Sequence, residues 1–170
     1  MEVPFRYKKI AYAALNVTDL ARSVLFYRDL MGLDLVEEQP GVAFLRCSRD
    51  HHSIVLYESP VHGLKRVAFE LESESDVEAA FAHFEALDMA PERVPEKEIK
   101  ALKQGPTFRV RERHSGLLIE LFAGATFMAK PFVPTVANIA RLGHVVISSA
   151  DFEASRDALV RDFGFRISDL

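Results

Sequence analysis

A repeated segment offers two different chemical groups at one matching position. The residues Tyr12-Ala-Ala-Leu-Asn-Val-Thr-Asp19 return 132 residues later as His144-Val-Val-Ile-Ser-Ser-Ala-Asp151. An imidazole at the start of a strand can bind a metal ion, whereas the earlier copy offers a phenol. A single histidine on an apolar strand can instead be a core residue that hydrogen-bonds to the backbone. The repeat predicts that a second domain begins near residue 140 and that the chain stops inside it.

A carboxylate interrupts another apolar run. Glu120 lies within Leu117-Leu-Ile-Glu-Leu-Phe122, a pattern typical of an inner strand. Because a buried carboxylate requires a partner, Glu120 is a further candidate for a functional role. Strand alternation would send the adjacent His51 and His52 to opposite faces, and we interpret them as turn and strand-start residues. The remaining histidines fit loops (His62, His114) and a helix surface (His83).

Two modules of the order β-α-β-β-β would position these groups. In the first, a strand is followed by a helix that Asp19 can cap and Gly32 can end. The second opens with a strand and a helix, for which Ser75 and Glu78 form a capping-box pattern. The expected strands cover residues 10–17, 33–37, 42–47, 53–57, 65–71, 92–94, 107–111 and 117–122. The charged segment 95–106 is predicted to be a solvated loop. A third module starts at Leu142, with a strand and a helix capped by Asp151.

Composition excludes several classes of protein. The chain has 170 residues, 49% hydrophobic and 27% charged, which is typical of a globular protein. A net charge of −4 argues against a nucleic-acid partner. No apolar run approaches the ~18 residues of a membrane span, and the amino terminus lacks the pattern of a signal peptide. The single cysteine, Cys47, sits in an apolar run and fits a strand residue in a reducing cytoplasm.

The modules and three phrases resemble the vicinal oxygen chelate superfamily of glyoxalases, bleomycin-resistance proteins and type I extradiol dioxygenases. The phrases are Phe26-Tyr-Arg-Asp-Leu-Met-Gly-Leu33, Ser115-Gly-Leu-Leu-Ile-Glu-Leu121 and Arg141-Leu-Gly-His-Val-Val-Ile147. The resemblance implies an α+β fold in which each pair of modules forms a cup-shaped mixed sheet with helices outside. The layout is most similar to two-domain extradiol dioxygenases. It implies an amino-terminal domain without metal over residues 1–125, a linker over 126–141, and the start of a catalytic domain over 142–170.

The family's metal ligands can be carried over by position. In the dioxygenases two histidines and a glutamate bind Fe(II), which a catechol chelates while O2 takes a third site. In the first domain these positions correspond to Tyr12, Arg66 and Glu120. Of these, only Glu120 could be a ligand, because arginine stays protonated. In the second domain His144 corresponds to the first ligand, and its two partners would lie beyond residue 170.

The resemblance therefore implies the amino-terminal part of an iron-dependent extradiol dioxygenase, with Mn(II) as a possible replacement for Fe(II). Its partners would be a small aromatic diol and O2, without nucleic acid or membrane, in a homo-oligomer. The chain alone is expected to lack metal and activity. One alternative is a glyoxalase-like lyase, but its additional ligand position corresponds to Leu56. Another is a ligand-sequestering module of the bleomycin-resistance kind, for which residues 1–125 would suffice.

Two structural predictions follow from the missing metal and the incomplete third module. Arg66 should take the place of the cation, with Glu120 as its carboxylate partner and the Tyr12 hydroxyl within hydrogen-bonding reach. The apolar face of residues 143–170 should pack against another chain or against the first domain, or else be mobile. Of these arrangements we favour a dimer in which two tails complete each other's partial sheet.

Overall fold

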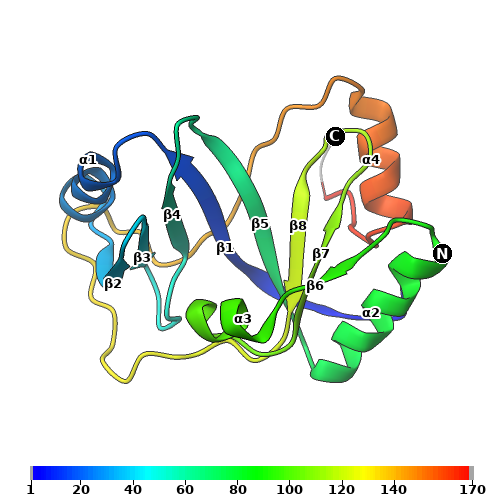
Figure 1. Cartoon of the computed structure of the whole chain (residues 1–170), viewed down its shortest axis with the longest axis horizontal. Coiled ribbons are helices and arrows are strands. Elements are labelled where there is room, and N and C mark those ends of the chain that lie inside the picture. The colour runs from blue at the N-terminus through cyan, green and yellow to red at the C-terminus, as the bar shows by residue number, and fades with distance from the viewer. Residues whose placement is uncertain (1, 169–170) are drawn as a thin grey trace. The chain divides into compact units, whose positions relative to one another are not determined.

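The chain folds as a mixed β-sheet with α-helices, shown in Figure 1 as a computed structural model that describes residues 2–168. The strands follow the order β2-β3-β4-β1-β5-β8-β7-β6. The predicted α+β class is confirmed. The chain divides into two compact units. The first unit comprises Ile10–Ala68 and Ala125–His144, and the second comprises Met1–Lys9, Phe69–Gly124 and Val145–Leu170.

The first unit contains the predicted β-α-β-β-β module. Its elements are β1 (Tyr7–Val17), which begins in the second unit, α1 (Leu20–Leu25), the π-helical turn η1 (Phe26–Leu30), β2 (Asp34–Gln39), β3 (Val42–Arg46) and β4 (Ile54–Glu58). Strand β1 pairs in parallel with β4, and β3 pairs antiparallel with both β2 and β4. The Asp19 carboxylate caps α1 by accepting a hydrogen bond from the Arg22 N–H, as predicted.

Residues 125–144 pack back onto the first unit. Phe132 and Ile139 contact its hydrophobic core, which includes the buried Leu45 and Leu56. The buried Arg46 guanidinium donates to the Lys130 carbonyl at 2.9 Å and to the Asp34 carboxylate at 2.9 Å. Figure 1 shows this stretch without helix or strand over most of its length. The predicted linker is therefore held on the unit by an apolar contact and by a buried cation.

The second unit repeats the module and adds two helices. It contains the end of β5 (Gly63–Leu71), then α2 (Glu74–Ala86), β6 (Glu92–Arg93), α3 (Glu96–Leu102), β7 (Thr107–Arg111), β8 (Leu118–Phe122) and α4 (Phe152–Arg161). Ser73 caps helix α2, because its hydroxyl accepts from the Asp76 N–H at 3.1 Å, so the predicted Ser75 cap is wrong by two residues. The predicted loop over 95–106 is also wrong, because α3 buries Leu102 there.

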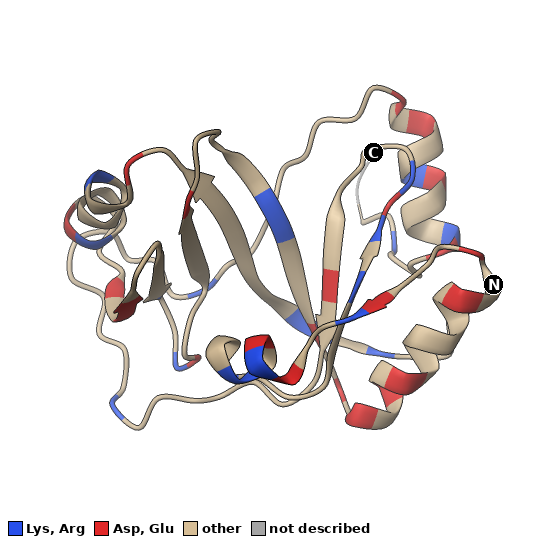
Figure 2. Ribbon diagram, viewed as in Figure 1, with Lys and Arg blue, Asp and Glu red and all other residues tan. Residues whose placement is uncertain are grey.

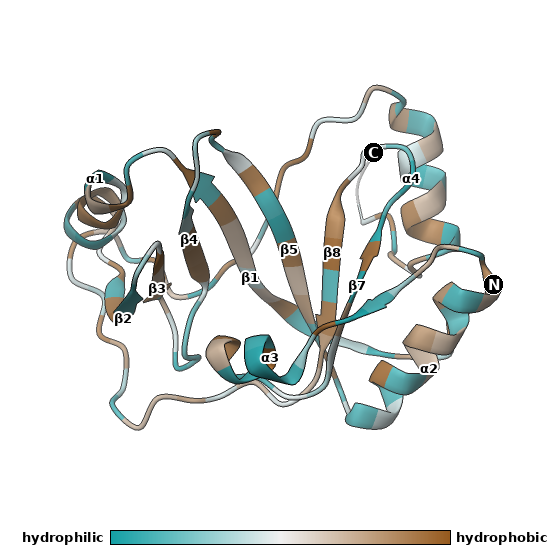
Figure 3. Ribbon diagram, in the orientation of Figure 1, coloured by the Kyte–Doolittle hydropathy of each residue, from teal (hydrophilic) through white to brown (hydrophobic). Residues whose placement is uncertain are grey.

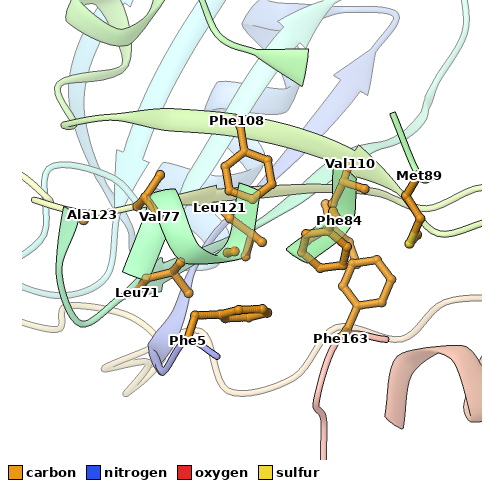
Figure 4. Packing of buried hydrophobic residues seen from close by; sticks show 12 residues of the cluster. Phe5, Leu71, Val77, Phe84, Met89, Phe108, Val110, Leu121, Ala123 and Phe163 are labelled. Atoms are coloured by element: carbon orange, nitrogen blue, oxygen red, sulfur yellow. The ribbon is translucent and has the colours of Figure 1, made fainter. Parts of the chain in front are cut away.

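Aromatic and aliphatic side chains form the core of the second unit (Figure 4). Three buried α2 residues, Val77, Ala80 and Phe84, face this core at helical spacing. Figure 3 shows the matching alternation of brown and teal on α2. Phe163, which follows α4, belongs to the same cluster and is fully buried.

The third module is represented by its helix. The Asp151 carboxylate caps α4 through the Ala154 N–H at 3.0 Å, as predicted. The strand predicted to start at Leu142 is not formed, since residues 143–148 lie outside any strand and no described strand pairs with them. Within the described residues the tail packs against the second unit of its own chain, one of the predicted arrangements; residues 169 and 170 lie outside them. Among the described helices, none has the length and apolar character of a membrane span.

Candidate functional site

A buried guanidinium and two tyrosine hydroxyls meet in the first unit. Arg66 on β5 has 1% of its surface exposed, and Tyr12 on β1 is equally buried. The Arg66 Nε and Nη2 donate to the Tyr12 hydroxyl at 3.3 and 3.2 Å, and Nη2 donates to the Tyr57 hydroxyl at 2.9 Å. The predicted meeting of Tyr12 and Arg66 is confirmed. In this unit, a fixed side-chain cation therefore lies beside Tyr12, the residue expected from the sequence to correspond to the first metal ligand.

The two tyrosines also present their rings to this cation. The Arg66 Cζ atom lies 5.6 Å from the Tyr12 ring centroid and 5.2 Å from that of Tyr57. An aromatic face attracts a guanidinium most strongly where water is excluded. The strands explain the arrangement: Tyr57 lies on β4, which pairs with β1 in the register Asn16↔Tyr57. Three strands therefore supply one polar cluster.

His52 lies against the same cluster and is held neutral. Its ring centroid is 4.5 Å from that of Tyr12, and its Nδ1 lies 3.1 Å from the His51 Nδ1. Burial, together with the electrostatic influence of the neighbouring His51 and of the Arg66 guanidinium, lowers the pKa of His52 to about 3. Both histidines are buried, so the sequence interpretation as turn residues missed their packing. An uncharged imidazole is thus part of the wall beside Arg66.

Glu120 is paired within the second unit. Its Oε2 accepts from the Arg109 Nε at 2.7 Å, and its Oε1 accepts from the Gln104 amide at 2.9 Å. Arg109 and Glu120 are direct cross-strand neighbours on β7 and β8. Figure 2 shows one acidic segment, in red, on β8, and Figure 3 shows a hydrophilic segment, in teal, on the same strand. Glu120 is fully buried, as predicted; its further pairing with Arg66 stays a prediction.

The described residues do not by themselves fit Fe(II). The expected metal ligand His144 is exposed and lies in an irregular stretch. Across residues 2–168, no group of three or more His, Cys, Asp or Glu side chains is placed to hold a metal ion. Leu56, at the additional glyoxalase position, is an apolar core residue. Burial raises the pKa of the Cys47 thiol, which does not favour a nucleophilic thiolate.

Comparison with known proteins places the chain in a family. The profile of the Glyoxalase/Bleomycin resistance protein/Dioxygenase superfamily matches residues 9–121, and the chain belongs to this superfamily. No curated protein sequence matches. The fold is similar to that of homoprotocatechuate 2,3-dioxygenase from Brevibacterium fuscum, with 31% identity and a TM-score of 0.81 over 97% of this chain and 48% of that one.

A second similar structure is that of a catechol 2,3-dioxygenase. It has 20% identity and a TM-score of 0.82, over 94% of this chain and 56% of that one, and at this identity it supports the fold alone. The chain thus spans about half the length of the solved structures that it matches. Another structure similar to this chain is that of an extradiol ring-cleaving dioxygenase from Brevibacterium fuscum, with 31% identity and a TM-score of 0.81 over 95% of this chain and 46% of that one.

Sequence reasoning missed several members of these clusters, among them Tyr57, His52 and Arg109. Arg109 could have been found, because the turn at 114–116 sets the register of the hairpin and places it opposite Glu120. Tyr57 required knowledge that β1 and β4 are parallel neighbours. His52 follows an irregular turn, where strand alternation does not apply.

Proposed function

We propose that this chain is the amino-terminal part of an iron-dependent extradiol ring-cleaving dioxygenase. One observation carries the proposal: the sequence repeat aligns His144 with Tyr12, and Tyr12 lies beside the buried Arg66. The similarity to homoprotocatechuate 2,3-dioxygenase along 97% of the chain supports the same branch of the superfamily. In this account the metal belongs to a following domain, with His144 as the first of its three ligands.

The first unit would then be a structural copy of the metal-binding unit. Arg66 supplies a permanent positive charge beside the tyrosines. Because an arginine stays protonated, it cannot act as a metal ligand. The proposed substrates of the whole protein are a small aromatic diol and O2. We propose Fe(II) as its metal, with Mn(II) as the alternative, because both accept a set of two imidazoles and one carboxylate.

A ring-cleavage assay tests this proposal. Catechol and homoprotocatechuate are incubated with O2 and either the 170-residue chain or the product of the complete reading frame, and O2 uptake is compared with loss of the diol. We expect equal consumption of both by the complete protein, none by the 170-residue chain, and loss of activity in His144→Ala but not in His62→Ala. Activity of the 170-residue chain, or full activity of His144→Ala, would overturn the proposal. A complete protein of only one module pair would favour a ligand-sequestering module.

A further inference from the structure

The segment that follows His144 is anchored in the core of the second unit. The Phe163 ring lies 4.8 Å from the Phe84 ring, and the two contact each other in Figure 4. The ring centroid of Phe165 lies 5.1 Å from that of Tyr7 and 5.2 Å from that of Phe69. Phe152, the first residue of helix α4, has 68% of its surface exposed. Apolar burial is therefore concentrated at the carboxyl end of α4.

Polar contacts hold the same end. The last carbonyls of a helix lack partners within the helix. The Tyr7 hydroxyl donates to the Phe163 carbonyl at 2.8 Å, and the His83 Nε2 lies 2.8 Å from the Asp162 carbonyl. Burial raises the pKa of Tyr7, so its hydroxyl keeps the proton that it donates. Further back, the buried Ser155 hydroxyl lies 3.3 Å from the Glu112 carboxylate.

A glycine lets the chain turn closely against the unit. Gly164 has φ +71°, and a Cβ atom there would lie 2.4 Å from the Val3 Cγ2. Any other residue would meet both backbone strain and a clash. Gly143, by contrast, has nothing within 4 Å of such a Cβ and provides a matched position in the same tail.

We propose that residues 151–165 are a docking latch that joins the third module to the second unit and thereby positions the His144 segment. By the repeat the latch belongs to the third module, but its anchor Phe163 belongs to the core of the second unit. Ile139, five residues before His144, packs on the first unit's core. The stretch that carries His144 is thus tethered at both ends. The positioning role rests on the proposed function, whereas the latch itself does not.

Amide hydrogen exchange on the 170-residue chain tests the latch without metal or substrate. In Phe163→Ala, we expect the amides of α4 and of the Phe84 turn in α2 to exchange roughly a hundredfold faster or more, because the ring fills the shared core. The control is Phe152→Ala, the same substitution at an exposed site of the same segment, which should leave these rates nearly unchanged. Equal rates in the two variants would overturn the latch.

Two milder substitutions keep the test valid if Phe163→Ala does not fold. Tyr7→Phe removes only the hydroxyl that reaches the Phe163 carbonyl, and Gly164→Ala strains the turn and its contact with Val3 but leaves the Phe163 ring in place. Both should speed exchange in α4, whereas Gly143→Ala should not. Unchanged α4 exchange in both would overturn the latch. These results are independent of the ring-cleavage assay, so a protected α4 in an inactive complete protein would refute the proposed function alone.

Discussion

Buried charge in this chain is matched by partners on neighbouring strands. Glu120 and Arg109 face each other across β7 and β8, and Arg109 also donates to Glu98 on α3 at 2.6 Å. Arg66 donates to two hydroxyls and faces two aromatic rings. Hydrogen bonds to a charged group are stronger than those between neutral groups. When one partner is removed, the cost of burying the remaining polar group is no longer offset. The effects of substitution should therefore be large and specific.

Replacing Arg109 should destabilise the second unit. Arg109→Leu removes a charged partner from a carboxylate with no exposed surface, and we expect a loss of about 2–4 kcal/mol in the free energy of unfolding. The double variant Arg109→Leu/Glu120→Leu should lose less, because no carboxylate remains to be neutralised. Urea unfolding measures both. Arg111→Leu, on the same strand with its guanidinium at the Gly116 carbonyl, is the control and should change little. A double variant as unstable as the single one would contradict this reading.

His52 should make the fold sensitive to acid. Its folded pKa of about 3 lies below the unfolded value of about 6.5, so the unfolded state binds a proton that the folded state does not. The contribution of neutral His52 to the free energy of unfolding is complete above pH 6.5. It is lost as the pH falls toward 3, at up to about 1.4 kcal/mol per pH unit. Unfolding at pH 7.5, 6 and 5 should show a shallower slope for His52→Phe than for wild type. A slope reduced equally by the exposed His62→Phe would refute this origin.

At the scale of elements, the start of α2 was ambiguous in the sequence. Ser73 and Ser75 each stand three residues before an acidic residue, so both fit a cap. The structure selects Ser73, and Asp76 is held further by the Arg6 N–H at 3.0 Å. Ser73→Ala should therefore cost about 1 kcal/mol of stability, and Ser75→Ala much less. Thermal unfolding of the two variants checks the assignment, and the reverse order of effects would show that it is wrong.

Other elements show where sequence patterns are sufficient and where they fail. The strands around Tyr12 and Glu120 were predictable, because apolar runs bounded by turns leave few alternatives. Helix α3 was not predicted, because its many charged residues are typical of a solvated loop. It buries Leu102, and Glu96 and Lys100 form an i,i+4 ion pair at 2.6 Å, which stabilises a helix. The strand at 143–148 failed for the opposite reason. Its pattern is that of a strand, but a strand forms only with a neighbour to pair with.

At the scale of the whole molecule, the chain after β8 visits both units in turn. It packs on the first unit through Phe132 and Ile139, then passes His144 and enters the core of the second unit at Phe163. The domain boundaries predicted from the repeat, after residues 125 and 141, separate sequence modules, whereas the two compact units are defined by their contacts. The predicted boundaries therefore stay a prediction. The match to about half of each dioxygenase structure fits the proposal that a second module pair completes the metal site.

The iron content of the complete protein tests the central claim most directly. After growth with iron and removal of loosely bound metal, we expect roughly one Fe per chain in wild type and in His62→Ala. His144→Ala should lose most of its iron, because two remaining ligands bind Fe(II) much more weakly than three. Tyr12→His should not add a second iron, since Arg66 beside it excludes a cation. Full iron occupancy in His144→Ala would contradict the assignment of His144 as a ligand and, with it, the account of the repeat.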